Sequence, residues 1–241
     1  MSARLGYSLD ALGASSAKHL LGQLARGIEK ESLRVRPDGN LSQATHPAAL
    51  GSALTHPLIT TDFCESQPEL ITGVHHNVQA CLDELSDIHR FVYRVLDDEL
   101  LWSSSMPCML GQDSQVPIAH FGTSNIGRTK HIYRLGLSAR YGRLMQTISG
   151  IHYNFSIPQQ LWSVIADIQG VQDSRAFRDA AYFGLIRNFR RHSWLLIYLF
   201  GASPAVCKSF VKDKAHSLES FDEGSLALPY ATSLRMGRLG Y

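Results

Sequence analysis

Apolar residues recur with helical spacing in several long segments of the chain. The clearest is residues 78–101, where the side chains on the 3.6-residue period are Val78, Cys81, Leu82, Leu85, Ile88, Val92, Val95 and Leu96. Residues 8–25 and about 133–149 are also predicted to be helical. A further helix is predicted over residues 175–200, because Gly201 and a nearby proline are typical of a helix end.

Other segments alternate in the way that β-strands do. In residues 151–157, apolar Ile151, Tyr153, Phe155 and Ile157 alternate with His152, Asn154 and Ser156, so three polar side chains point to one face. Residues 26–35 and 66–74 are further strand candidates. Helices and strands follow one another in irregular order, which favours an α+β fold over a regular βαβ series.

The composition is that of a globular chain. The 241 residues are 44% hydrophobic and 18% charged, which is enough for a buried core and excludes intrinsic disorder. The 23 basic and 21 acidic residues give a net charge of +2, without the concentrated positive charge of a nucleic-acid binder. We therefore expect no nucleic-acid partner.

The sequence shows neither a membrane-spanning segment nor an export signal. The longest apolar run, residues 194–202, is about half of the roughly 20 residues that a membrane-spanning helix needs. The N-terminal segment contains Asp10 and lacks the apolar core of a signal peptide. The cysteines stand singly, as is typical of free thiols in a reducing cytosol, at Cys64, Cys81, Cys108 and Cys207. We expect a cytoplasmic protein with no membrane partner.

Two carboxylates lie two residues apart in the first strand candidate, at Glu29 and Glu31. On a strand this spacing puts both on one face, where they repel each other unless solvent screens them or a divalent cation binds both. Taken alone, the pair is explained more simply by a solvated edge strand, because Glu and Lys are mostly exposed.

A second group of acids lies at Asp62, Glu65 and Glu69, within an otherwise apolar and hydroxylated segment. Glu65, Gln67 and Glu69 share strand parity, and Pro68 is expected to confine the segment to a sheet edge or a bulge. An acidic edge that discourages aggregation is the alternative to a binding site. His152 could complete a carboxylate cluster as a neutral imidazole ligand, although such a histidine is more often simply hydrogen-bonded.

The segment Gly122-Thr123-Ser124-Asn125-Ile126-Gly127-Arg128-Thr129 is close to the phosphate-binding pattern GxxxxGK[ST], but Arg replaces the lysine and no doubly wound parallel sheet accompanies it. We therefore reject a P-loop. Further along, Arg134 could bind a phosphate or carboxylate and Tyr133 could line a small-substrate pocket. A solvated helix face explains these two residues equally well.

Read together, several motifs resemble the proteobacterial type of the glutamate–cysteine ligase family. They include GIEKESLRV, TTDFCES, FGTSNIGRTKHIYRLGL, MQTISGIHYNFSIP and LPYATSLR. The resemblance covers residues 26–241, and motifs of this length exclude a chance match. It implies an antiparallel sheet with flanking helices, similar to that of glutamine synthetase.

The resemblance also implies a reaction. The family joins the γ-carboxyl group of glutamate to the amine of cysteine, using ATP, through a γ-glutamyl phosphate, in the first step of glutathione biosynthesis. Mg²⁺, or Mn²⁺ in its place, neutralises the triphosphate during phosphoryl transfer. The implied partners are therefore the small molecules glutamate, cysteine and ATP.

Site residues carry over where this sequence matches the family's motifs. The resemblance implies cation ligands at Glu29, Glu31, Asp62, Glu69 and His152. It places Arg134 opposite the transferring phosphoryl group and assigns the α-carboxylate of glutamate to Arg235. It implies a cysteine site lined by Phe63, Tyr133, Leu137, Gln146 and Tyr241.

The sequence departs from the family in three residues and in length. Relatives can carry Glu at the position of Leu135 and commonly carry Pro at that of Gly73, and Pro68 lies in the strand that bears Glu69. Relatives also continue well beyond residue 241, and their remaining half supplies another carboxylate ligand and another arginine. We expect residues 1–241 to be a single N-terminal portion of the catalytic domain, without the C-terminal half.

Three functional hypotheses follow. The first is a glutamate–cysteine ligase whose isolated 241-residue chain is inactive and self-associates through exposed surface. The second is a ligase for a different amine acceptor. The third is a non-catalytic remnant or binding module that keeps the glutamate and cation sites without turnover.

Overall fold

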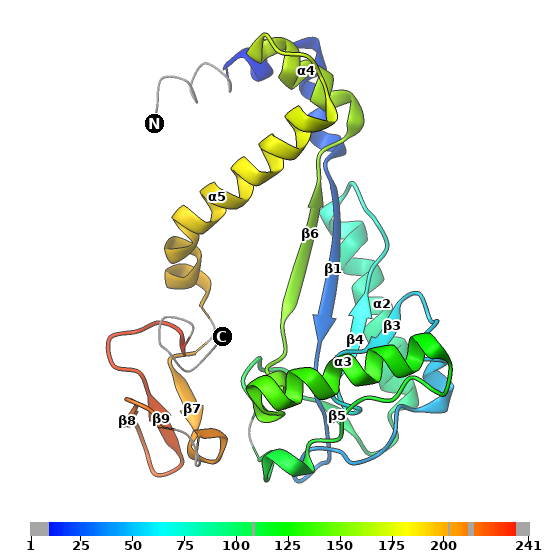
Figure 1. The fold of residues 1–241 in the computed structure, drawn as a ribbon, viewed down its shortest axis with the longest axis vertical. Helices are drawn as coiled ribbons and strands as arrows, with labels where there is room; N and C mark the ends of the chain where they lie inside the picture. The colour runs from blue at the N-terminus through cyan, green and yellow to red at the C-terminus, as the bar shows by residue number, and fades with distance from the viewer. Residues whose placement is uncertain (1–9, 108, 202, 212–214, 235–241) are drawn as a thin grey trace.

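A four-stranded antiparallel sheet runs along the molecule (Figure 1). The computed structural model describes residues 10–107, 109–201, 203–211 and 215–234. The strand order is β3-β4-β1-β6, with β3 Ile59–Thr61, β4 Pro68–Ile71, β1 Ala25–Glu31 and β6 Ile151–Ser156. The α+β class, with an antiparallel sheet flanked by helices, is therefore confirmed.

Helix α2, Val78–Val95, covers one face of this sheet. Its apolar stripe packs against the sheet and the loop before β3, in a cluster made of Leu50, Ile59, Leu70, Ile88, Val92, Leu96 and Leu101. Asn77 begins the helix because its side chain accepts a hydrogen bond from the Ala80 amide. Since side chains alternate along a strand, the residues next to Leu70 face away from α2.

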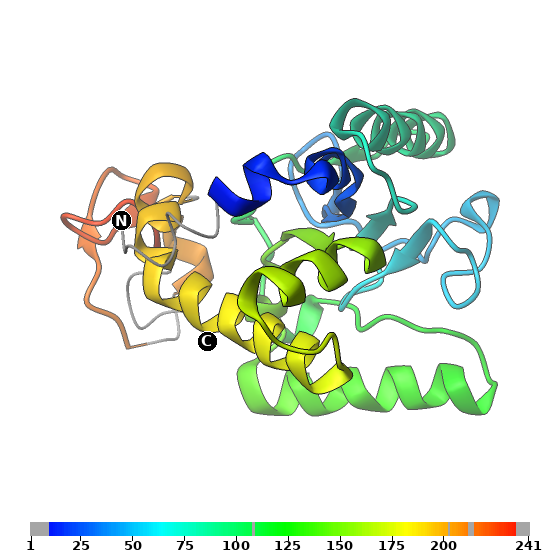
Figure 2. The same cartoon turned by 90° about the horizontal axis from the view of Figure 1, so that it is seen from above.

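Helix α3, Asn125–Tyr141, lies on the other side of the sheet from α2 (Figure 2). The helix predicted over 133–149 is thus misplaced at both ends. It begins earlier because Ser124 accepts a hydrogen bond from the Gly127 amide, and it ends at Gly142, whose φ of 80° favours glycine. The short 3₁₀ helix η4, Leu144–Thr147, follows.

The remaining helices lie above the sheet in Figure 1 and along its open side. Helix α5, Arg175–Phe200, confirms the predicted helix 175–200, whereas α4, Gln159–Gln169, was not predicted. Of the helix predicted over 8–25, residues 10–14 are α-helical, whereas Ser16–Gln23 form the 3₁₀ helix η1 and β1 begins at Ala25. None of the helices in the described part of the chain is both long and apolar enough to cross a lipid bilayer.

Two short sheets complete the fold. Strand β2, Arg34–Val35, pairs with β5, Leu100–Leu101, so the helix predicted to reach residue 101 ends six residues earlier. Near the C-terminal end, a three-stranded sheet has the strand order β7 Ala205–Cys207, β9 Ser225–Ala227 and β8 Glu219–Ser220. The 3₁₀ helix η5, Lys208–Val211, follows β7. Two further 3₁₀ helices lie earlier in the chain, η2 Ala48–Leu50 and η3 Asp113–Gln115.

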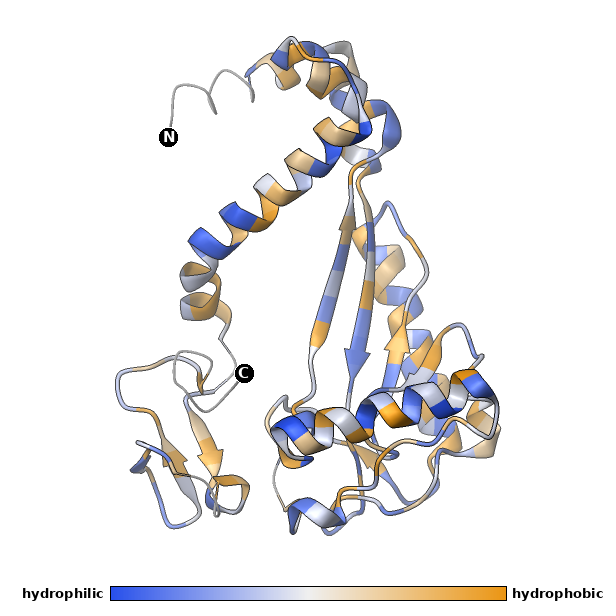
Figure 3. Ribbon diagram, viewed as in Figure 1, coloured by the Kyte–Doolittle hydropathy of each residue, from blue (hydrophilic) through white to orange (hydrophobic). Residues whose placement is uncertain are grey.

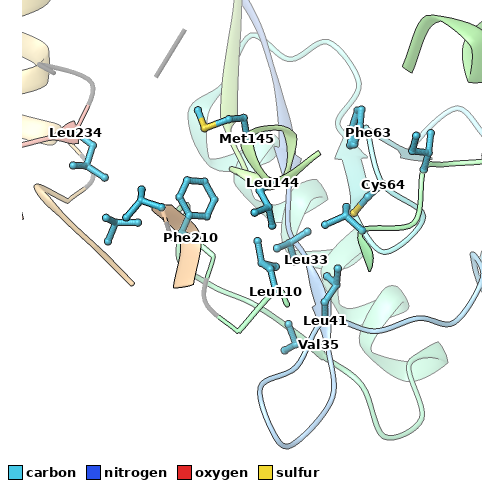
Figure 4. Packing of buried hydrophobic residues seen from close by; sticks show 14 of the residues in the cluster. Leu33, Val35, Leu41, Phe63, Cys64, Leu110, Leu144, Met145, Phe210 and Leu234 are labelled. Atoms are coloured by element: carbon cyan, nitrogen blue, oxygen red, sulfur yellow. The ribbon is translucent and has the colours of Figure 1, made fainter. Parts of the chain in front are cut away.

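The small C-terminal sheet packs onto the main body through the largest apolar cluster (Figure 4). Phe210 and Leu234 from the C-terminal region belong to the same cluster as Leu33, Leu144 and Met145. This contact brings residues beyond α5 next to the lower end of the long sheet. It also bounds the cavity described below.

The strand predictions need two corrections. The candidate 26–35 is split, because the chain leaves the long sheet after Glu31 and resumes pairing as β2. The candidate 66–74 is β4, and Pro68 does not make it an edge strand: β4 lies between β3 and β1. Pro68 is tolerated there because it is the first residue of the strand.

Candidate functional site

The sheet face turned away from α2 carries the predicted carboxylates and histidine. Glu29 lies opposite His152 in the pairing of β1 with β6, and Glu31 lies opposite Glu69 in the pairing of β1 with β4. Directly opposed residues of antiparallel strands project to the same face, so these four side chains belong to one surface. Their grouping confirms the shared face expected for Glu29 and Glu31 and places His152 beside them.

His152 lies between the two carboxylates of β1. Its Nε2 atom is 3.2 Å from Glu31 Oε1, and its Nδ1 atom is 3.8 Å from Glu29 Oε2. Asn154, the next polar residue on β6, donates a hydrogen bond of 2.9 Å to Glu29 Oε1. The polar face of β6 therefore holds both carboxylates through two side chains that the strand alternation brings to the same side.

Glu31 is the most firmly held of these residues. Its Oε2 atom accepts hydrogen bonds from the Gly150 amide at 2.9 Å and from Gln67 Nε2 at 3.3 Å, and only 8% of the side chain is exposed. A Cβ atom on residue 150 would lie 3.1 Å from His152 Nε2, so glycine lets the backbone approach both side chains. These contacts turn Glu31 Oε1 toward His152.

Asp62 lies in the turn between β3 and β4. The Asp62 amide donates to the Gln67 carbonyl at 2.9 Å and the Gln67 amide donates to Cys64, which closes the turn. The parity expected for Glu65 and Gln67 is therefore wrong, since both precede the strand. Glu65 is buried and accepts hydrogen bonds from the His46 and His120 amides, so it braces the loops.

Burial raises the pKa of three carboxyl groups at this face, and negative neighbours raise the pKa of two of them further. Burial raises the pKa of Asp62, and burial followed by the charge of Asp62 raises that of Glu31. Burial, and then the charges of Asp62, Glu31 and Glu29, raises the pKa of Glu69 to about 7. Negative charge thus accumulates on this face beyond what its nearby cations compensate, which is the situation that a bound divalent cation relieves.

The donor set suits a hard cation such as Mg²⁺, which binds carboxylate oxygens and water. Among the residues that the structure describes, no three acidic, histidine or cysteine side chains already enclose a position for a metal ion. Mg²⁺ does not need such an enclosure, because it is usually held by one or two carboxylates together with water and substrate phosphates. The residues therefore suit a cation that one or two of these carboxylates hold together with water, with positions left for substrate phosphates.

We expect Glu69→Gln to stabilise the cation-free chain at pH 8 and to have little effect at pH 5. The pKa of Glu69 in the folded chain, about 7, lies above the reference value of 4.5. The contribution of protonated Glu69 to the free energy of unfolding is therefore present at low pH and is lost as the pH rises through about 7. Solvent screening of this part-exposed side chain reduces the expected gain to roughly 1 kcal/mol, or about 2–4 °C in Tm.

Differential scanning calorimetry in the presence of a chelator measures this effect. The exposed carboxyl Glu223 supplies a control, Glu223→Gln, which should leave the pH dependence of Tm unchanged. Equal Tm values for wild type and Glu69→Gln at pH 8 would contradict the raised pKa that burial and the neighbouring carboxylates give Glu69.

A cavity of about 540 Å³ opens beside the carboxylates. Glu31, Asp62 and His152 line one side of it, and the C-terminal region lines the other through Val206, Phe210, Ser233 and Leu234. Gln146 also lines the cavity, as does Ser149, whose hydroxyl is buried and has no hydrogen-bond partner among the described residues. The cavity is large enough for a small polar substrate.

Arg134 reaches the acidic turn from α3 but does not line the cavity. Its guanidinium donates hydrogen bonds to the carbonyls of Thr61, Asp62 and Lys130, and stacks 4.5 Å from the centre of the Phe121 ring. Burial lowers its pKa, and the charge of Asp62 opposes that effect. Arg134 thus holds the turn that carries Asp62 and keeps two further N–H groups for other acceptors.

The residues expected for a cysteine site are only partly brought together. Tyr133 and Leu137 lie one turn apart on α3, with Tyr133 exposed and Leu137 packed against the cluster that contains Leu144 and Met145. Phe63 is 2% exposed and lies in that same apolar core, and it is not among the cavity residues. Arg235 and Tyr241 lie outside the described residues.

Two contributors to the site escape sequence reasoning. Gly150 donates a hydrogen bond to Glu31 through its backbone amide. Gln67 donates through its side chain but lies in the turn before β4, so the alternation along the strand does not place it. The one available signal was the glycine directly before the alternating segment, which is typical of a close backbone approach. The near P-loop sequence leads into α3, as a P-loop would lead into a helix, but the long sheet of the described residues is antiparallel, which supports the rejection of a P-loop.

Comparison with known proteins gives a consistent result. The sequence profile of the family described as glutamate-cysteine ligase matches residues 9–241. A curated glutamate–cysteine ligase of Pseudomonas entomophila is 54% identical over 100% of this chain and 45% of its own length, and one of Saccharophagus degradans is 55% identical over 92% of this chain and 42% of its own. This chain therefore spans less than half the length of these relatives.

Solved structures agree with the sequence comparisons. The crystal structure of a glutamate–cysteine ligase of Francisella tularensis in complex with AMP has a TM-score of 0.82 and 45% identity, covering 90% of this chain and 43% of that one. A bifunctional glutathione synthetase of Pasteurella multocida has a TM-score of 0.74 and 32% identity, covering 97% of this chain and 28% of that one.

Proposed function

Since the chain belongs to the glutamate–cysteine ligase family, we propose that it carries part of a site that joins the γ-carboxyl group of glutamate to the amine of cysteine, with ATP as co-substrate. The observation that supports this most is the shared face of Glu29, Glu31, Glu69 and His152 beside a cavity of about 540 Å³. In this proposal residues 1–241 form a single portion of a catalytic domain, and the product belongs to glutathione biosynthesis.

The carboxylate face is proposed to receive the triphosphate of ATP. Glu29, Glu31, Asp62, Glu69 and His152 would hold Mg²⁺ or Mn²⁺, and the cation would supply charge neutralisation during phosphoryl transfer. A part-buried cluster of carboxylates would otherwise repel the phosphates. Glu31 and Asp62 line the cavity, so this role places phosphoryl transfer at the edge where the cavity meets the sheet.

The reaction balances in two steps. The γ-carboxylate of glutamate attacks the terminal phosphorus of ATP, which gives γ-glutamyl phosphate and ADP. The cysteine amine then attacks the acyl carbon, phosphate leaves, and the nitrogen loses a proton. Arg134 is proposed to orient the phosphoryl group with the N–H groups that do not bind backbone carbonyls, because a guanidinium supplies five donors.

The cavity is proposed to bind the two amino-acid substrates. Gln146 lines it, and Tyr133 and Leu137 lie on α3, which precedes Gln146 in the chain, so these three are the described candidates for the cysteine site. Arg235 is the proposed partner of the glutamate α-carboxylate, and the residues directly before it, Ser233 and Leu234, line the cavity. Phe63 would act from within the core by supporting Asp62, which is its neighbour in sequence.

ADP release from ATP, glutamate and Mg²⁺ tests the proposal. The assay would use the chain mixed with a polypeptide that corresponds to the remaining part of the Pseudomonas entomophila relative, and that full-length relative as a positive control. We expect ADP release to depend on cysteine. Release with another amine but not with cysteine would favour a different acceptor, and binding of ATP without release under any condition would favour a non-catalytic module.

A further inference from the structure

Gln67 is a buried polar residue beneath the carboxylate face, and stability alone does not explain why a glutamine stands there. Its side chain is fully buried, and its Oε1 atom has no hydrogen-bond partner within the described residues. An unpaired buried amide oxygen lowers stability, and an apolar side chain of similar length would fill the same space without that cost. Such a conflict between a residue and its surroundings is typical of functional positions.

The polar contact that Gln67 does make is with Glu31. Its Nε2 atom donates to Glu31 Oε2 at 3.3 Å, beside the Gly150 amide that donates to the same oxygen at 2.9 Å. Both fixed donors thus occupy Oε2, while Oε1 faces His152 at 3.2 Å. The reversed amide would point its oxygen at the carboxylate, so the observed orientation suits an ionised Glu31.

The backbone of Gln67 also fixes the position of Asp62. The Gln67 carbonyl accepts a hydrogen bond from the Asp62 amide at 2.9 Å, which closes the turn before β4. One residue therefore relates a carboxylate on β1 to one in the turn before β4, through its side chain to Glu31 and through its main chain to Asp62.

We propose that Gln67 is a positioning residue that fixes the Glu31 carboxylate so that Oε1 alone is presented to a cation. This inference rests on the proposed cation-binding role of Glu31. Groups that orient a metal ligand through a hydrogen bond commonly change metal affinity about 10–100-fold when they are replaced. Gln67→Met removes the amide, keeps the length of the side chain and leaves the backbone hydrogen bonds of residue 67 in place.

The test measures Mn²⁺ binding to the 241-residue chain by electron paramagnetic resonance, without turnover. We expect Gln67→Met to bind Mn²⁺ at least about tenfold more weakly than wild type. Ser66→Ala is the matched control, because Ser66 is equally buried and adjacent but donates its hydrogen bond to the Ser42 carbonyl, away from Glu31. Ser66→Ala should keep the wild-type affinity even where its Tm falls.

A second measurement uses wild type alone and covers the case in which Gln67→Met does not fold. Addition of Mg²⁺ should shift the NMR signals of the Gln67 side-chain amide. The exposed Gln79 amide, which donates to Asp83, is the internal reference and should not shift.

The outcomes separate this inference from the proposed function. Weaker Mn²⁺ binding by Gln67→Met together with wild-type binding by Ser66→Ala supports the positioning role, as does a Mg²⁺-dependent shift confined to Gln67. Equal Mn²⁺ affinity of wild type and Gln67→Met overturns the positioning role and leaves the cation site intact. A wild-type chain that binds no Mn²⁺ overturns the cation site and the positioning role together.

Discussion

Replacing Glu29 or Glu31 by glutamine is expected to lower the turnover of γ-glutamylcysteine formation at least about a hundredfold in any active form of the protein. Both carboxylates lie on the sheet face that carries His152, and Glu31 also lines the cavity. In the proposed site, removing either charge would weaken the binding of the cation that neutralises the triphosphate, so the loss is expected in phosphoryl transfer. Glutamine keeps the shape of the side chain, so the fold should survive.

The measurement is ADP release at increasing Mg²⁺ concentration, with circular dichroism to verify folding. Lys30→Met is the matched control, because Lys30 lies between the two glutamates on β1 but projects to the opposite face of the sheet. It removes a charge from the same strand and should leave the Mg²⁺ dependence unchanged. Turnover like that of wild type in both glutamine variants at saturating Mg²⁺ would reject the cation assignment.

The faces of the strands could be predicted from the sequence, but their partners could not. Alternation in residues 26–31 and 151–156 gives the side on which Glu29 and His152 point. That Glu29 pairs with His152, and Glu31 with Glu69, depends on register between segments far apart in the chain. No local signal in either segment specifies that register, because it is set by tertiary packing and turn geometry.

The sequence mispredicts the ends of helices and strands where a single side chain or backbone angle determines them. Ser124 begins α3 by accepting a hydrogen bond from the Gly127 amide, nine residues before the predicted start at about residue 133, and Gly142 ends the helix through a positive φ. Pro68 suggested an edge strand, but a proline at the first position of a strand is compatible with an inner strand. Gln67 resembled a strand residue until the turn that it closes was visible.

The alternating pattern of β6 also misleads about burial. Ile151, Tyr153 and Phe155 form an apolar face, yet all six residues of β6 are exposed in this chain. Helix α5 likewise has no buried residue, although apolar and polar patches alternate along it (Figure 3). A sequence pattern shows that a face is apolar, whereas the structure shows what covers that face.

These uncovered surfaces lead to the second large prediction, that a polypeptide of residues 1–241 alone has no detectable ligase activity and self-associates. β6 is an end strand of the sheet, so one edge of its backbone is open to pairing. Exposed apolar side chains on β6 and α5 add a surface that favours association. His152 of β6 and Ile197 of α5 also line the cavity beside Glu31, so water would reach it from this side and weaken the proposed electrostatic contacts with the phosphates.

Addition of a polypeptide that corresponds to the remaining length of a relative should restore activity, because this chain spans only 45% of such a relative. Cysteine-dependent ADP release and light scattering after size-exclusion chromatography would be measured on the chain alone and on the mixture. The same mixture made with Glu31→Gln is the control, and it should form the complex without activity. Activity of the isolated, monomeric chain near that of a full-length relative would contradict the prediction. It would show that phosphoryl transfer does not need the β6 side of the site to be covered.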